Sequence, residues 1–155
     1  MRILAVCAGN ICRSPAAEAA IQEAAAGAGV DIETDSAGTG AWHIGQPPHP
    51  DGVAAGARVG LEVRGRARKV TPADFERFDI ILAMDRANLR DLHELAPSRE
   101  ARARIRLFRT YDPTATSDEV PDPWGGSEER YDETVRIVRA AASGLVAEIL
   151  EHTGA

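Results

Sequence analysis

Residues 2–15 read Arg-Ile-Leu-Ala-Val-Cys-Ala-Gly-Asn-Ile-Cys-Arg-Ser-Pro and contain a strand, a short loop and the start of a helix. The apolar run ending at Val6 is typical of a parallel strand buried on both faces. Pro15 suits the first turn of a helix, which the Ala-rich sequence favours as far as about residue 28. A loop in this place directs backbone N–H groups and the positive end of the helix dipole at one small volume. We therefore predict an anion site in residues 7–14.

Two side chains of this loop suit reaction with a phosphate group. Cys7 begins the loop, so its sulfur is expected at the floor of the anion site, where the field that holds a phosphate also favours thiolate over thiol. Arg13 carries a planar guanidinium that can bind two phosphate oxygens at once. Gly9 allows the backbone to approach a ligand closely, and Asn10 is among the few other residue types that tolerate a positive φ.

Ser14 has two alternative roles. As the N-cap of the helix, it would precede Pro15, with Glu18 in the first turn. Its hydroxyl could instead donate to the sulfur of Cys7. The local sequence leaves both roles open.

Length, charge and cysteine content restrict the class of protein. A chain of 155 residues is long enough for one domain, residues 1–155, with a real core. The net charge of −6 argues against a general nucleic-acid binder, although the basic stretch 58–69 could face an acidic partner. Both cysteines lie in the loop, which indicates a reducing compartment. No apolar run has the length of a signal sequence or a membrane span, so we expect a cytoplasmic protein that does not bind membranes.

The rest of the chain alternates strands with helices. Further strands are predicted at 31–37, 79–84 and 104–108, and further helices at 50–59, 72–78 with Thr71 as N-cap, 87–95 and 127–152. This order predicts a doubly wound, Rossmann-like α/β fold, in which helices cover both faces of a four-stranded parallel sheet. Ligands bind at the carboxyl ends of the strands in such sheets. Cys7, Asp85 and the loop 109–126 are predicted to lie at that edge.

A thiolate that attacks a phosphate monoester needs an acid to protonate the leaving oxygen. Three carboxylates of the loop 109–126 are candidates, namely Asp112, Asp118 and Asp122. Their local sequence does not choose among them. No metal is required by this chemistry.

The string Cys-x-Gly-Asn-x-Cys-Arg-Ser-Pro at 7–15 closely resembles the signature of the low-molecular-weight protein tyrosine phosphatases. The resemblance continues over nearly the whole chain, including Ser36-Ala37-Gly38-Thr39, Ile81-Leu82-Ala83-Met84-Asp85 and Asp122-Pro123. It implies a metal-independent hydrolase without a cofactor that acts on phosphotyrosine proteins, and on small aryl phosphates, through a cysteinyl-phosphate. The phosphate, or a similar oxyanion, would be bound by the loop residues Ala8, Gly9, Asn10, Ile11, Cys12, Arg13 and Ser14. We expect a monomer.

The resemblance also assigns roles outside the loop. It makes Asp122 the general acid and later the base for water, with Cys7 as nucleophile. Trp42 and Trp124 match residues of opposite walls of the substrate cleft. Two further residues match positions that support the loop in the family. Asp85 matches an acidic residue that orients the loop arginine, and Ser36 lies near a hydroxyl that supports the loop.

The chain departs from the family pattern at two positions. Gly65 stands where the family often has a histidine that braces the loop asparagine, which puts the bracing of Asn10 in doubt. Gly125 follows Trp124, so a second aromatic residue is missing there. Cys12 is expected either to form a protective disulfide with Cys7 under oxidation or to be a small packed side chain. The four histidines lack the spacing of metal ligands and are expected at the surface or in loops; they are His43, His49, His93 and His152.

Three other functions deserve comparison. An arsenate reductase can share this loop but needs further redox cysteines, and the chain has only Cys12 beside Cys7. A protein-arginine phosphatase branch has threonine where this loop has Ile11, which favours phosphotyrosine. A non-catalytic anion-binding module is the third alternative, if Asp122 does not reach the pocket.

Overall fold

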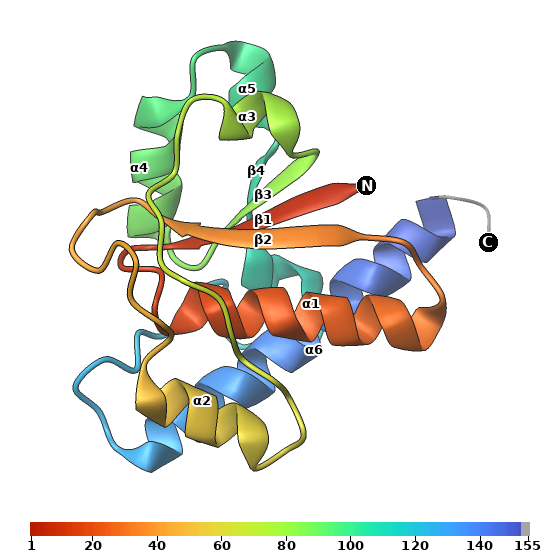
Figure 1. Cartoon of the computed structure of the whole chain (residues 1–155). Helices are drawn as coiled ribbons and strands as arrows, with labels where there is room; N and C mark the ends of the chain where they lie inside the picture. Colours follow the sequence, from red (N-terminus) through yellow and green to blue (C-terminus); the bar gives the residue numbers. More distant parts are fainter. Residues whose placement is uncertain (153–155) are drawn as a thin grey trace.

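The computed structural model describes residues 1–152, which form a four-stranded sheet with helices on both faces (Figure 1). In chain order the elements are β1 (Arg2–Cys7), α1 (Arg13–Ala28), β2 (Glu33–Gly38), α2 (Pro50–Ala57), α3 (Asp74–Arg77), β3 (Ile80–Ala83), α4 (Arg86–Leu95), α5 (Arg99–Ala103), β4 (Ile105–Leu107), the 3₁₀ helix η1 (Phe108–Tyr111) and α6 (Glu128–His152). The strands are ordered β2-β1-β3-β4, and every neighbouring pair is parallel. The predicted fold class is confirmed.

Two apolar layers cover the sheet, one on each face. Alternate residues of β1 enter different layers, because successive side chains of a strand point to opposite faces. Ile3 packs in the layer that contains residues of α1 and α6, whereas Leu4 packs in the layer that contains residues of α4. Figure 1 shows α1, α2 and α6 on one side of the sheet and α3, α4 and α5 on the other.

Helix α6 supplies the longest apolar stripe of the molecule. Its core-facing residues recur at helical spacing and are all buried, namely Tyr131, Val135, Val138, Ala142, Leu145 and Ile149. The stripe packs against α1, whose alanines allow the two helices to approach closely. No helix within residues 1–152 combines the length and the apolar character that crossing a membrane requires.

The helix starts differ from the predictions in two places. Helix α1 begins at Arg13 with Cys12 in the cap position, so Ser14 lies inside the helix and Glu18 lies beyond its first turn. Helix α3 begins at Asp74 rather than at residue 72, because the residues before it form turns in which the backbone N–H groups of Asp74 and Phe75 donate to the carbonyls of Thr71 and Pro72. The Thr71 hydroxyl donates to the Asp74 carboxylate and does not cap the helix.

Two short elements were not predicted. The five-residue helix α5 fits between α4 and β4, and Ser98 caps it by accepting from the backbone N–H of Ala101 at 3.1 Å. The 3₁₀ helix η1 occupies the start of what was expected to be an irregular loop. Neither segment is long enough to show a helical repeat of apolar residues, so their periodicity gives no signal.

Two helical glycines test the packing of this fold. At Gly144 of α6 a Cβ would overlap the carbonyl oxygen of Tyr111, whereas at Gly27 of α1 a Cβ would meet open space. We expect Gly144→Ala to lower the free energy of unfolding by ~1–3 kcal/mol, because backbone must move. Gly27→Ala should raise it by up to about 1 kcal/mol, because alanine favours a helix. Urea unfolding at equal m-value measures both changes in the free energy of unfolding. A Gly144→Ala variant with an unchanged free energy of unfolding would contradict the close packing of α6 on η1.

Candidate active site

The loop between β1 and α1 forms the floor of a cavity of about 180 Å³ at the carboxyl edge of the sheet. The cavity is lined by Cys7, Ala8, Gly9, Ile11, Cys12, Arg13, Trp42, His43, Asp122 and Trp124. Figure 1 shows this edge, where the end of β1 lies beside the beginning of α1. The structure thus brings residues from three separate segments into one pocket.

The sulfur of Cys7 is surrounded by hydrogen-bonding groups. The hydroxyl of Ser14 lies 2.9 Å from it, and the backbone N–H of Asn10 donates to it at 3.3 Å. Ser14 therefore contacts the sulfur and makes no side-chain cap for α1. Hydrogen bonds of this kind stabilise a thiolate more than a thiol, because they donate to the charged form.

Asn10 gives the loop its turn. Its φ of 59° is in the left-handed region, as the sequence predicted, and its amide group links two distant segments. The Nδ2 group donates to Ser14 Oγ at 2.8 Å, and Oδ1 accepts from the backbone N–H of Arg68 at 3.0 Å. The bracing that Gly65 put in doubt is therefore present, and a main-chain group supplies it.

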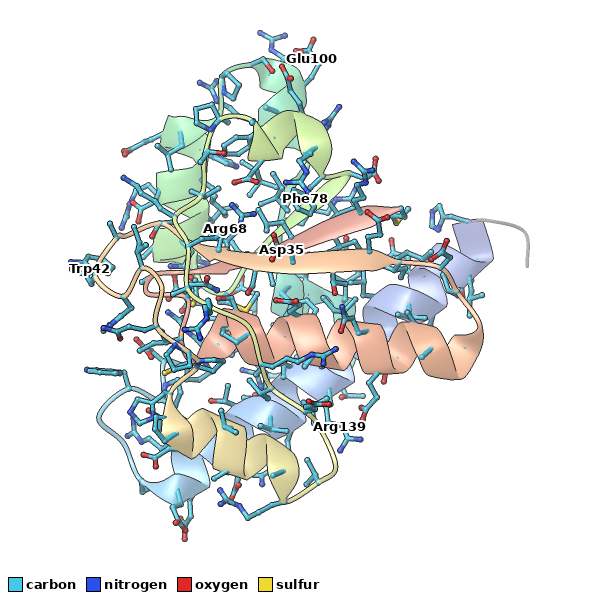
Figure 2. All side chains as sticks on the ribbon, viewed as in Figure 1. Asp35, Trp42, Arg68, Phe78, Glu100 and Arg139 are labelled. Atoms are coloured by element: carbon cyan, nitrogen blue, oxygen red, sulfur yellow. The ribbon has the colours of Figure 1, made fainter. Side chains whose placement is uncertain are left out.

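The Arg68 side chain fixes the segment that braces Asn10. Its guanidinium donates to both oxygens of Asp74 at 3.0 Å and lies 3.1 Å from Asp35, beside which it appears in Figure 2. Burial by itself would raise the pKa of Asp74, but the hydrogen bonds from Arg68 and Thr71 outweigh it and lower that pKa. The segment is thus tied to β2 and to α3.

Arg13 is 3% exposed and carries its charge into the floor of the pocket. It donates to Asp85 Oδ2 at 2.6 Å and to the carbonyl of Val120 at 3.0 Å. Burial opposes the charge, but the hydrogen bond to Asp85 and the electrostatic effect of Cys7, Asp85 and Asp122 together outweigh burial and raise the pKa of Arg13. Asp85 also caps α4, since its other oxygen accepts from the backbone N–H of Asn88 at 2.8 Å. Both carboxylate oxygens of Asp85 therefore have partners, and the position of the Arg13 guanidinium is fixed.

The structure separates the three candidate acids. Asp122 lines the pocket, with its Oδ2 3.8 Å from the Arg13 guanidinium. Asp118 instead pairs with Arg86 at 2.6 Å, outside the residues that line the pocket. Asp112 accepts hydrogen bonds from Thr114 within its own turn, and these bonds lower its pKa. Only Asp122 of the three lines the pocket.

Cys12 differs from Cys7 in its surroundings. Its sulfur lies 3.8 Å from the hydroxyl of Tyr131, and burial raises the pKa of the thiol to about 11. Both cysteines are free in the structure. At neutral pH Cys12 is therefore a protonated, packed thiol.

Ser36 is buried in β2, next to the carboxyl group of Glu18 in α1. Burial raises the pKa of Glu18, and the hydrogen bond with Ser36 opposes that rise. Ser36 thus links β2 to α1, the helix that carries Arg13.

Two histidines contact an aromatic residue of the cleft, an arrangement that the sequence did not reveal. Trp42 and Trp124 are 70% and 57% exposed, and Trp42 projects from the edge of the molecule in Figure 2. The rings of His43 and His49 lie 5.6 and 5.4 Å from the ring of Trp124. The expectation that both belong to loops or the surface missed this contact. Their position in a His-containing loop after β2, at the carboxyl edge of the sheet, was the only available signal.

Known proteins resemble this chain over nearly its full length. The sequence model of the family described as low molecular weight phosphotyrosine protein phosphatase matches residues 2–154. A low molecular weight protein-tyrosine-phosphatase of Streptomyces coelicolor is 40% identical, covering 97% of this chain and 94% of that protein. The crystal structure of a protein tyrosine phosphatase from Entamoeba histolytica superposes with a TM-score of 0.95 at 34% identity, covering 99% of both chains.

A relative with a different substrate shares the same fold. The arginine phosphatase YwlE of Bacillus subtilis superposes with a TM-score of 0.87 at 26% identity, covering 97% of this chain and 96% of that one. The tyrosine phosphatases above are the more similar in sequence. Together with the match across residues 2–154, they show that this chain belongs to the low molecular weight phosphotyrosine protein phosphatase family, a family of hydrolases.

Proposed function

We propose that this protein hydrolyses phosphotyrosine in proteins through a cysteinyl-phosphate intermediate. The observation that carries the proposal is that the sulfur of Cys7, the guanidinium of Arg13 and the carboxyl group of Asp122 share one small cavity. A nucleophile, an anion clamp and a proton donor are the three groups that the reaction requires.

The first step is attack of the Cys7 thiolate on phosphorus. A sulfur–phosphorus bond forms while the bond from phosphorus to the tyrosine oxygen breaks, and Asp122 transfers its proton to the leaving oxygen. The loop amides and Arg13 stabilise the charge on the three other phosphate oxygens. Because Asp85 and the Val120 carbonyl already hold the guanidinium, little reorganisation is needed during the reaction.

The second step returns Cys7 to its starting state. Asp122, now a carboxylate, removes a proton from water, which attacks phosphorus and displaces the thiolate as inorganic phosphate leaves. Ser14 and the Asn10 N–H stabilise the departing thiolate. Neither step needs a metal ion or a cofactor. Residues 1–152 contain no group of three or more His, Cys, Asp or Glu side chains that could hold a metal.

The cleft walls support an aromatic substrate. Trp42 and Trp124 border the pocket and expose large ring surfaces, which suit stacking on a phenyl ring.

The proposed active form is a monomeric single domain in the cytoplasm, acting on phosphotyrosine proteins. The net charge of −6 and the free cysteines accord with a partner that is neither nucleic acid nor membrane and with a reducing compartment.

Matched phosphopeptides test the substrate class. We expect a phosphotyrosine peptide to have a higher kcat/KM than a phosphoarginine peptide of the same flanking sequence, because the walls offer two indole rings to an aryl group. Release of inorganic phosphate measures both reactions, with Cys7→Ser as the inactive control. A preference for phosphoarginine would replace the proposed substrate with that of the YwlE relative.

A series of aryl phosphates tests Asp122 as the acid. Asp122→Asn should lower kcat/KM by about 10²–10⁴-fold when the leaving phenol has a pKa near 10. The loss should be much smaller for a strongly acidic phenol, which leaves without a proton. Asp112→Asn and Asp118→Asn are the matched controls and should keep the wild-type slope against leaving-group pKa. An Asp122→Asn slope no steeper than that of the wild type would remove Asp122 from the mechanism.

Alkylation tests the difference between the two thiols. With a pKa of about 11, Cys12 is thiolate in only about one molecule in 10⁴ at pH 7. Iodoacetate at pH 7 should therefore label Cys7, inactivate the enzyme and be slowed by inorganic phosphate. Peptide mapping by mass spectrometry locates the label, and Cys7→Ser should stay unlabelled. Labelling of Cys12 before Cys7 would contradict the assignment of the nucleophile.

A further inference from the structure

The indole of Trp124 contacts two histidine rings from one segment. His43 lies at a ring distance of 5.6 Å with a tilt of 45°, and His49 meets the indole edge-on at 5.4 Å and 84°. Trp124 is otherwise 57% exposed, and two glycines at 125 and 126 follow it. The ring contacts therefore restrain this part of the loop, together with the bond from the Gly126 backbone N–H to the carbonyl of Pro123 at 2.8 Å.

His49 is itself fixed by several contacts. It stands before the first residue of α2, where its Nδ1 accepts from the backbone N–H of Asp51 at 3.1 Å. Its backbone N–H donates to the carbonyl of Ile11 in the phosphate loop at 2.8 Å. Its ring also stacks on Tyr131 of α6 at 5.2 Å and 22°. One residue thus contacts the phosphate loop, α2, α6 and Trp124.

The contact with Trp124 leads directly to the proton donor. The backbone N–H of Trp124 donates to Asp122 Oδ1 at 3.1 Å, while Asp122 Oδ2 faces the Arg13 guanidinium at 3.8 Å. A displacement of Trp124 would therefore carry the Asp122 carboxyl group with it. Asp122 has its side chain 52% exposed, so few other contacts hold it in place.

We propose that His49 is a positioning residue of the active site, whose ring holds Trp124 and, through it, keeps the Asp122 carboxyl group above the phosphate loop. The proposal rests on the proposed function, in which Asp122 protonates the leaving group. His49 touches neither substrate nor reacting atoms in this account. Its ring acts by limiting the positions that the Asp122–Trp124 turn can take.

The cap of α2 is the simpler role for His49, and the two roles can be separated. Capping needs only an acceptor at the position of Nδ1, which asparagine provides as well as any residue. Holding Trp124 needs a flat ring between the indole and Tyr131, which phenylalanine provides and asparagine does not. His49→Asn therefore keeps the cap and removes the ring, whereas His49→Phe keeps the ring and removes the cap.

The aryl phosphate series measures how the His49 variants change proton donation by Asp122. Loss of the ring contacts should lower kcat/KM of His49→Asn about tenfold for a phenol of pKa near 10, the change that one or two aromatic contacts can produce. For a strongly acidic phenol the loss should be under about twofold, so the slope steepens. His49→Phe should keep the wild-type slope while its Tm falls. A wild-type slope in His49→Asn, or equal steepening in both variants, would overturn the proposal.

Fluorescence gives a second readout that does not depend on activity. In a Trp42→Phe background Trp124 is the sole tryptophan. Quenching of its emission by acrylamide should increase in His49→Asn but not in His49→Phe. His93→Asn, which alters an exposed histidine of α4, is the matched control and should leave quenching unchanged. Unchanged quenching in His49→Asn would also overturn the proposal.

The two readouts separate a failure of this proposal from a failure of the proposed function. If Asp122→Asn shows no steeper slope, the assignment of the acid is wrong, and acrylamide quenching alone decides whether His49 holds Trp124. If Asp122→Asn steepens the slope and His49→Asn does not, the acid is right and the positioning role of His49 is wrong.

Discussion

The buried ion pair between Arg13 and Asp85 is the constraint on which the site depends. Arg13 is the first residue of α1, and Asp85 caps α4, so the pair joins helices on opposite faces of the sheet. Arg13 is 3% exposed, so its charge carries a large desolvation cost, and the carboxylate partner offsets that cost. The charge that we propose binds phosphate is therefore also a structural link between the two layers of the fold.

Strand order explains why these two helices meet. In the order β2-β1-β3-β4, the chain leaves β1 toward one edge of the sheet and leaves β3 toward the other. The helices that follow these strands consequently cover different faces, and a crevice opens between their first residues at the carboxyl edge. Cys7 ends the strand at this crevice, and the loop with Asp122 closes it from the side.

Sequence reasoning reached the parts of the molecule that are local in the chain. The strand, loop and helix around Cys7 follow from an apolar run and a helix start, and the stripe of α6 follows from its repeat. It left the start of α1 open, because Ser14 could either cap the helix or contact Cys7. Ser14 has the side chain of a good N-cap, yet its hydroxyl contacts Cys7 and Asn10, so the helix begins before it.

The long-range contacts of the site lay beyond local reasoning for a related reason. Asp112, Asp118 and Asp122 are alike in their local sequence, and only the resemblance to the family chose among them. The structure distinguishes them by their surroundings: Asp112 bonds to Thr114, Asp118 pairs with Arg86, and Asp122 lines the pocket. The rings around Trp124 come from a loop some eighty residues earlier in the chain, a separation across which periodicity carries no information.

The bracing of Asn10 by the main chain has a consequence for variation in this loop. Every residue except proline has a backbone N–H at position 68, so the donor to Asn10 does not depend on one kind of side chain, as a bond from a histidine side chain would. Position 65 is thereby released from that task and adopts a φ of 114°, a conformation that residues with a Cβ rarely take. The support of Asn10 thus depends on the path of the main chain at position 68, which the Arg68 guanidinium fixes through Asp74 and Asp35, and not on a side chain at position 65.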